Sequence, residues 1–84
     1  MLFDVKVHVE LKDGVLDTAG KAVSKSLSHL GYEHIDRSIR IGKIIKLQLD
    51  EENIKAAEQK TEEICHKLLA NPVIEQYQFF IEEA

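Results

Sequence analysis

Few side chains in this 84-residue chain could do chemistry. Its single cysteine, Cys65, is followed by His66, the only such neighbouring pair. Adjacent helical residues point about 100° apart and do not face each other. Cys65 falls on the apolar stripe of an expected helix, where a thiol behaves as a small hydrophobe. A nucleophile needs a base beside it, so we expect Cys65 to belong to the core.

The histidines also lack the arrangement of a metal site. His8, His29, His34 and His66 share no i, i+4 spacing, and no paired cysteines accompany them. A metal site needs three or four converging ligands. Neither a P-loop nor a dinucleotide-binding fingerprint occurs. We therefore expect no catalytic, cofactor-binding or metal-binding residue in this chain.

Two basic residues flank an isolated glycine in Arg40-Ile41-Gly42-Lys43. Gly42-Lys43 predicts a tight turn between two strands, which would place Arg40 and Lys43 at a hairpin tip. There they could bind an acidic partner or a phosphate, although a solvated tip is the ordinary alternative. We take Arg40 and Lys43 as candidate partner contacts.

Hydrophobic periodicity predicts the elements that position these residues. Alternation over Leu2–Lys12 indicates a strand with one buried face. A helix is expected to begin at Asp17 or Thr18 and to end before Gly31. Further strands are predicted over Ile35–Ile41, Ile45–Leu49 and Tyr77–Ile81. A second helix follows Asp50-Glu51-Glu52-Asn53 and stops at Pro72; its predicted apolar stripe is Ile54, Ala57, Thr61, Ile64, Cys65 and Leu68.

The predicted order is βαββαβ, an α+β fold with an antiparallel sheet and two helices on one face. Eighty-four residues suffice for a single domain over 1–84. Leu2, Ile44 and Phe80 stand out of phase with the core positions of their strands, so they would expose apolar surface on the other face. We expect this face to be covered, and take the three as candidate oligomer contacts.

Composition excludes several classes of partner. The formal net charge is −4, and the eleven Lys and Arg are interleaved with acids. Nucleic-acid binding is therefore not expected, because it usually needs a basic stripe. No run of 18 apolar residues occurs, so no membrane span is expected. The N-terminus begins a strand without a signal-peptide pattern, and we expect a cytoplasmic protein.

Several motifs in order carry a family resemblance. They are Val5-Lys6-Val7-His8-Val9-Glu10-Leu11-Lys12-Asp13-Gly14-Val15-Leu16-Asp17, Gly20-Lys21-Ala22-Val23, Arg40-Ile41-Gly42-Lys43 and Cys65-His66-Lys67-Leu68-Leu69-Ala70-Asn71-Pro72-Val73-Ile74-Glu75. Together they resemble PurS, the small subunit of phosphoribosylformylglycinamidine (FGAM) synthase, over nearly the whole chain.

The resemblance implies an accessory role in de novo purine biosynthesis. In that family a large synthase subunit, PurL, uses ATP and Mg²⁺, and a glutaminase subunit, PurQ, releases ammonia from glutamine. The small subunit, a homodimer or homotetramer, bridges the two and supports ammonia transfer. The resemblance also implies that the isolated chain has no activity and binds no cofactor.

Two other classes remain open from the residues alone. βαββαβ folds also serve as small-molecule-binding regulatory modules, and fold does not decide function. A small hydrolase resembling acylphosphatase would need an arginine in the loop after the first strand. Here that loop reads Lys12-Asp13-Gly14-Val15, with an acid in the way.

Overall fold

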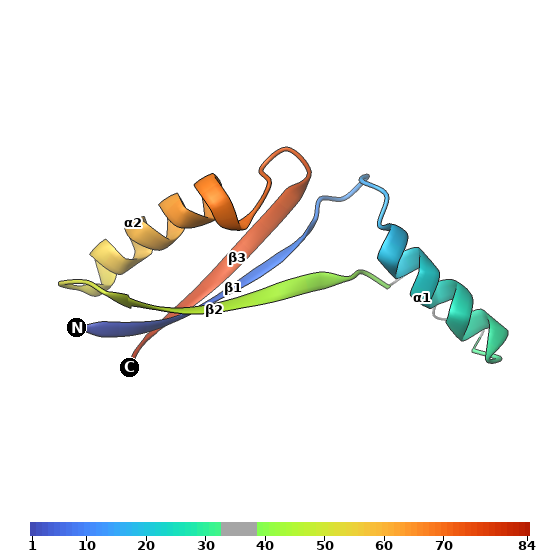
Figure 1. Ribbon diagram of the computed structural model, residues 1–84, viewed down its shortest axis with the longest axis horizontal. Coiled ribbons are helices and arrows are strands. Elements are labelled where there is room, and N and C mark those ends of the chain that lie inside the picture. Colours follow the sequence, from blue (N-terminus) through green and yellow to red (C-terminus); the bar gives the residue numbers. More distant parts are fainter. Residues whose placement is uncertain (33–38) are drawn as a thin grey trace.

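The computed structural model describes residues 1–32 and 39–84, which form three strands and two helices (Figure 1). In chain order they are β1 (Leu2–Leu11), α1 (Thr18–His29), β2 (Gly42–Asp50), α2 (Ile54–Ile64) and β3 (Glu75–Glu83). A π-helical turn over Cys65–Leu69 continues α2. The predicted α+β class, the antiparallel sheet and the two helices are confirmed.

The sheet is built around β1, in the order β2-β1-β3, with both pairs antiparallel. Val7 lies opposite Ile45 on one side and opposite Phe79 on the other. The predicted alternation of β1 is confirmed, because Phe3, Val5, Val7 and Val9 are buried and their neighbours are exposed.

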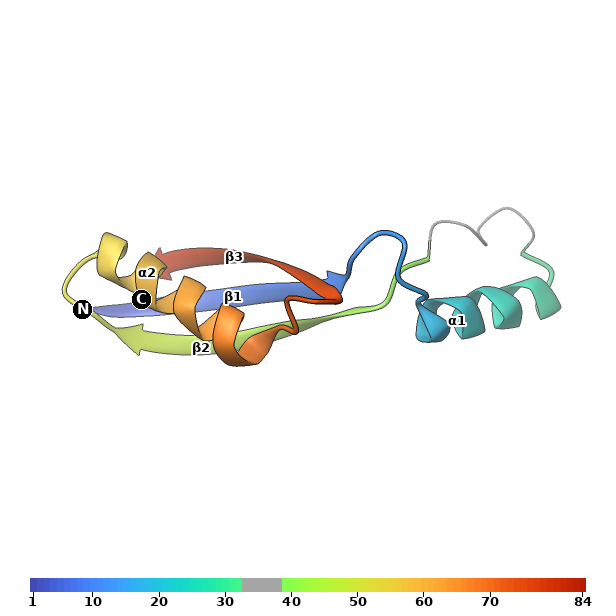
Figure 2. The same cartoon turned by 90° about the horizontal axis from the view of Figure 1, so that it is seen from above.

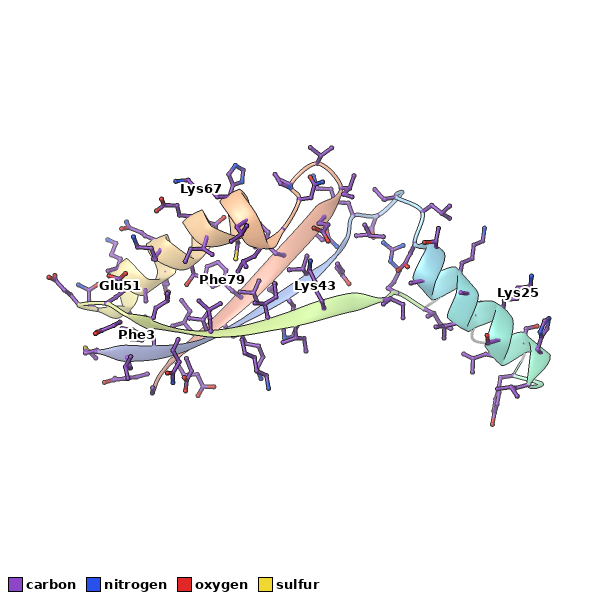
Figure 3. All side chains as sticks on the ribbon, in the orientation of Figure 1. Phe3, Lys25, Lys43, Glu51, Lys67 and Phe79 are labelled. Carbon is purple, nitrogen blue, oxygen red and sulfur yellow. The ribbon has the colours of Figure 1, made fainter. Side chains whose placement is uncertain are left out.

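α2 covers the face of the sheet that these β1 residues share. Asn53 caps the helix by accepting a hydrogen bond from the Ala56 amide at 2.8 Å. Cys65 packs fully buried against the valines of β1. Figure 3 shows Phe79 between the sheet and α2. The core is therefore one layer of side chains between a helix and a three-stranded sheet.

The π-helical turn alters one predicted core position. Regular helical spacing placed Leu68 on the apolar stripe, but Leu68 is 79 % exposed. The wider turn advances the inward position by one residue, so that Leu69 packs against the core instead. The prediction for Leu68 was wrong because periodicity assumes an unbroken α-helix.

α1 has its predicted ends but not its predicted position. Asp17 is the N-cap, and Gly31, with a φ of +97°, follows the C-cap residue Leu30. The helix was expected on the same sheet face as α2. Instead it lies beyond the end of the sheet (Figures 1 and 2). The physical reason is that the β1–β2 pairing ends at Glu10 and Gly42, and α1 follows β1 beyond that end of the ladder.

The predicted tight turn at Gly42-Lys43 was wrong. Both residues lie within β2, where Gly42 pairs with Glu10 and Lys43 pairs with Val9. At Gly42 the ladder, not a turn, requires a glycine, because a Cβ would lie 2.7 Å from the Val9 carbonyl oxygen. Of the strand predicted over Ile35–Ile41, residues 35–38 lie outside the described residues, and Ile39–Ile41 lead into β2 without being strand.

The molecule is elongated, measuring 52 × 26 × 14 Å with a Cα radius of gyration of 16.5 Å. A compact chain of this length would have a radius of gyration of about 12 Å. The excess comes from α1, which extends the long axis past the sheet (Figure 2). A chain of this shape leaves much of its surface available to partners.

Candidate interaction surfaces

The side chains that could take part in chemistry have structural roles instead. Cys65 has no exposed surface, and burial raises the pKa of its thiol, with a further contribution from the charge of Glu62. A protonated, inaccessible thiol is a poor nucleophile. Residues 1–32 and 39–84 contain no group of three His, Cys, Asp or Glu side chains that could hold a metal ion. In the same ranges no helix is long and apolar enough to span a membrane.

The Tyr77 phenol has a raised pKa, and its role is also structural. Its hydroxyl donates a hydrogen bond to the Glu62 carboxylate, which ties β3 to α2. That bond, followed by burial, raises the pKa of Tyr77 to about 12. The side chain therefore stays protonated in the neutral range and is no general base there.

Arg40 joins two segments of the chain and does not lie at a free hairpin tip. Its Nη2 donates to the carbonyl oxygens of Leu11 at 2.9 Å and Lys12 at 3.2 Å. Arg40 thus joins the segment before β2 to the end of β1, although the residue as a whole stays exposed. The predicted hairpin tip was wrong, because Arg40 precedes β2 and binds carbonyl oxygens that lie beyond the last pair of the β1–β2 ladder.

Asp17 completes the same junction from the other side. Its Oδ1 accepts a hydrogen bond from the Gly20 amide at 2.7 Å, and its Oδ2 accepts one from the Ile41 amide at 2.9 Å. The Gly20 bond is the largest of the interactions that hold the pKa of Asp17 below its usual value. A single buried carboxylate therefore links the start of α1 to the entry of β2.

Lys43 does not form a basic pair with Arg40 around a turn. It lies opposite Val9, on the strand face that α2 covers further along, yet it is exposed. Figure 3 places it on β2 between α2 and α1. It remains available to a partner, whereas Arg40 is held by the backbone of β1.

The three candidate oligomer contacts share the sheet face turned away from α2, which we call the outer face. Leu2, Ile44 and Phe80 are 50 %, 58 % and 50 % exposed. Fourteen residues of the ladders make up this face: Leu2, Asp4, Lys6, His8, Glu10, Gly42, Ile44, Lys46, Gln48, Asp50, Gln76, Gln78, Phe80 and Glu82. Their role as contacts stays a prediction.

The structure gathers two of these three around His8. Ile44 lies directly opposite His8 on β2, and the Phe80 ring meets the His8 ring edge-on at 5.3 Å between centroids. Leu2 is remote from them, opposite Asp50 at the far end of the ladder. Sequence reasoning missed His8, which alternation had placed among the solvated residues of β1.

A shallow hollow of about 570 Å³ adjoins this apolar centre. Most of its lining belongs to the outer face: His8, Glu10, Ile44, Gln76 and Gln78, with Gly42 between them. Glu10 and Gln76 provide side chains in the same row as Gly42, which has none and so leaves a gap. The outer face is therefore contoured and partly apolar.

A second exposed apolar surface lies on α1. Ala19, Ala22, Val23, Leu27 and Leu30 recur at three- and four-residue spacing and form one apolar stripe of the helix. The described residues leave it open: Val23 is 41 % and Leu30 is 73 % exposed. The stripe was visible in the sequence, but that the fold would leave it uncovered was not.

A family model described as PurS, phosphoribosylformylglycinamidine (FGAM) synthase, matches residues 4–83. The chain is similar to the phosphoribosylformylglycinamidine synthase subunit PurS of Synechocystis, with 42 % identity over 94 % of this chain and 78 % of the relative. The Bacillus subtilis subunit PurS is 39 % identical over 98 % of this chain and 95 % of its own length.

Solved structures agree in fold. The crystal structure of Methanocaldococcus jannaschii PurS, a subunit of formylglycinamide ribonucleotide amidotransferase, superposes with a TM-score of 0.84 at 34 % identity, over 98 % of both chains. A chain in the structure of PurLQS from Thermotoga maritima gives a TM-score of 0.87 at 28 % identity, over 98 % of this chain and 99 % of that one. With the family match over nearly its whole length, the chain belongs to the PurS family, whose members are subunits of FGAM synthase.

Proposed function

We propose that this chain is the non-catalytic small subunit of FGAM synthase and bridges the large synthase subunit PurL and the glutaminase subunit PurQ. The observation that carries the proposal is the match, over 98 % of this chain, to a chain of the PurLQS structure. The buried thiol and the protonated Tyr77 support a role without chemistry of its own.

In this assignment the reaction belongs to the partners. PurL would use ATP and Mg²⁺ to activate the amide oxygen of formylglycinamide ribonucleotide, and PurQ would supply ammonia from glutamine. The small subunit holds the two together and so supports ammonia transfer between them. The site of action would be the cytoplasm, where this step of purine biosynthesis takes place.

Self-association is part of the proposal, as a homodimer or homotetramer. The elongated shape supports it, because the radius of gyration of 16.5 Å exceeds that of a compact chain by roughly 4.5 Å. The exposed apolar stripe of α1 and the apolar centre of the outer face both offer surface to a second copy.

The function is tested by reconstitution with the PurL and PurQ of the same source. Glutamine-dependent FGAM formation should rise with the concentration of this subunit and saturate. Ammonia-dependent FGAM formation by PurL alone should not depend on it. The isolated chain should hydrolyse neither glutamine nor ATP. If glutamine-dependent synthesis is equally fast without the subunit, the bridging role is refuted.

Lys43 and Arg40 remain our candidate contacts with an acidic surface of PurL or PurQ. They need different tests, because Arg40 also donates hydrogen bonds within the chain. Lys43→Ala removes an exposed charge without breaking a hydrogen bond of the described residues. A charge at the rim of an interface acts mainly on association rate and salt dependence. We expect half-saturation to need more of the variant at low salt, with unchanged maximal activity.

Lys60→Ala, an exposed lysine of α2, is the matched control for Lys43→Ala. Arg40→Ala should weaken assembly too, but it also removes the donor to the carbonyl oxygens of Leu11 and Lys12, so its melting temperature must be measured beside its activity. If Lys43→Ala and Lys60→Ala titrate alike, the docking surface lies elsewhere.

A further inference from the structure

Helix α1, its cap Asp17 and residues 39–41 form one unit, which we call the arm. Gly20 lies so close to Ile39 that a Cβ on Gly20 would be 2.7 Å from the Ile39 carbonyl oxygen. Asp17 accepts a hydrogen bond from the Ile41 amide at 2.9 Å. The first turn of α1 and residues 39–41 are therefore held against each other by contacts that do not involve the sheet.

The arm is joined to the sheet at a narrow base. Two chain segments make this base, residues 12–16 after β1 and Ile41-Gly42 at the start of β2. α1 lies beyond the end of the sheet (Figure 2), so packing on the sheet does not fix its direction. Gly14, in the first segment, has a φ of +87° and nothing within 4 Å of the position of a Cβ. Loop residues of this kind can absorb changes in backbone angle, so the base can act as a hinge.

Arg40 links the arm to β1 across this base. Its Nη2 donates to the carbonyl oxygens of Leu11 at 2.9 Å and Lys12 at 3.2 Å. Nη2 has two hydrogens, and these two acceptors engage them. Arg40 forms no ion pair with any acid of residues 1–32 and 39–84. Among the described residues, the guanidinium is therefore held by neutral acceptors.

These two hydrogen bonds use the nitrogen that a carboxylate needs. A guanidinium binds a carboxylate through two parallel hydrogen bonds, either from Nε and Nη2 or from Nη1 and Nη2. Nε and Nη1 cannot form such a pair, because Cδ lies between them. An acid that binds Arg40 through two bonds must therefore displace Leu11 or Lys12. A carboxylate carries a full negative charge and a carbonyl only a dipole, so the acid is the stronger acceptor.

The displaced carbonyl groups would not be left without partners. Lys12 is exposed and Leu11 is half-buried, so water can replace the guanidinium. The Lys12 carbonyl oxygen also accepts a hydrogen bond from the Val15 amide at 3.1 Å. Exchange of an exposed hydrogen bond for one to water changes the free energy of the chain little. The link between Arg40 and β1 can therefore open when a better acceptor arrives.

We propose that Arg40 is a latch, and that a carboxylate of a partner subunit opens it during assembly. In the free subunit Arg40 holds the arm at one angle to the sheet. A bidentate carboxylate fits only the open state, so its binding shifts the arm toward that state. The arm then turns about its base, and the exposed stripe of α1 can adjust to the partner. This proposal rests on the proposed function, which takes Arg40 as a contact with PurL or PurQ.

The angle of the arm can be measured as a distance between α1 and α2. Lys25→Cys and Lys60→Cys place spin labels on exposed positions of the two helices, and Cys65→Ala removes the native thiol. Double electron–electron resonance gives the distribution of distances between the labels. Labelled chains are diluted with unlabelled chains, so that only distances within one chain are recorded.

In the free subunit the latch predicts a narrow distribution for the labelled chain and a broader one after Arg40→Met. Methionine keeps the length of the side chain but has no donor. Lys21→Met is the matched control, because Lys21 is an exposed cation of α1 that forms no ion pair within residues 1–32 and 39–84. It removes the same charge and should leave the distribution narrow.

Addition of PurL and PurQ tests the opening itself. The distance in the labelled chain with Arg40 intact should shift or broaden once both partners are saturating. The Lys21→Met chain should respond in the same way. This measurement keeps Arg40 in place, so it is decisive even if Arg40→Met fails to fold.

The outcomes separate the latch from the function on which it rests. If free Arg40→Met gives the same narrow distribution as the chain with Arg40, the arm is not held by Arg40. If saturating partners leave the distance unchanged, Arg40 does not open, even where glutamine-dependent FGAM formation shows that the subunit bridges PurL and PurQ. If the subunit does not stimulate that synthesis at all, the proposed function itself fails.

Discussion

At the scale of single residues, Cys65 is a core side chain and not a reactive one. It is fully buried against the valines of β1, and burial raises the pKa of its thiol. The sequence predicted this from the helical stripe on which Cys65 lies. Its inaccessibility allows a direct test of the claim that this subunit has no nucleophile.

Cys65→Ser should lower the free energy of unfolding by about 1–3 kcal/mol, because it places a hydroxyl in an apolar layer. The activity of the reconstituted complex should be unchanged at temperatures where the variant is folded. Urea unfolding followed by circular dichroism measures the first quantity. Cys65→Ala, which introduces no hydroxyl, is the control. A loss of activity in both folded variants would contradict the structural role.

At the scale of elements, α1 depends on a junction rather than on packing against the sheet. Asp17 caps the helix and also accepts a hydrogen bond from the Ile41 amide, and Arg40 binds the end of β1. The helix could not be held by its apolar stripe, which the described residues leave exposed. Its orientation therefore depends on a few polar contacts at its base.

Asp17→Ala should lower the melting temperature, because two backbone amides lose their acceptor at once. Asp17→Asn is the informative comparison: its one carbonyl oxygen can still cap Gly20, but its amide cannot accept from Ile41. We expect an intermediate loss of stability. Thermal unfolding by circular dichroism is the measurement, and equal melting temperatures for wild type and Asp17→Ala would contradict the junction.

The same carboxylate predicts a pH dependence. Hydrogen bonds to the ionised form hold the pKa of Asp17 below its usual value in the folded chain. The stabilisation is therefore fully present above the unfolded pKa, near pH 4, and is lost as pH falls through the folded pKa. The difference in melting temperature between wild type and Asp17→Asn should shrink below about pH 4.

At the scale of the whole molecule, the chain is too extended to bury all its apolar surface alone. α1 projects past the sheet with Val23 and Leu30 exposed (Figure 1). Folding leaves this surface in water unless a second chain covers it. The shape itself therefore argues for assembly, independently of the outer face.

Val23→Glu should weaken self-association or the binding of PurL and PurQ, because it puts a charge into the exposed stripe. Lys25→Gln makes the same change in net charge on the polar side of α1 and should have no effect. Sedimentation velocity measures self-association, and the reconstitution titration measures partner binding. If Val23→Glu behaves like Lys25→Gln in both, the stripe of α1 is not an interface.

The sequence by itself determined the elements whose signal is local. Alternation defined β1 and its buried face, capping chemistry gave both ends of α1, and the motifs gave the family. Each of these depends on neighbouring residues, so no tertiary information was needed. The apolar positions of the outer face were also readable, because the period of a strand assigns every residue to one of two faces.

Tertiary structure decided what depends on contacts between distant segments. The sequence predicted a turn at Gly42, but its pairing with Glu10 makes it part of β2. It also predicted a hairpin tip at Arg40, whereas this side chain donates hydrogen bonds to the carbonyl oxygens of Leu11 and Lys12. Leu68 left the core because a π-helical turn shifted the phase. His8 is the centre of a surface because the fold places Ile44 of β2 and Phe80 of β3 beside it. In each case the outcome depends on a residue that is far away in the sequence or on a break in the regular period. Periodicity carries no information on either.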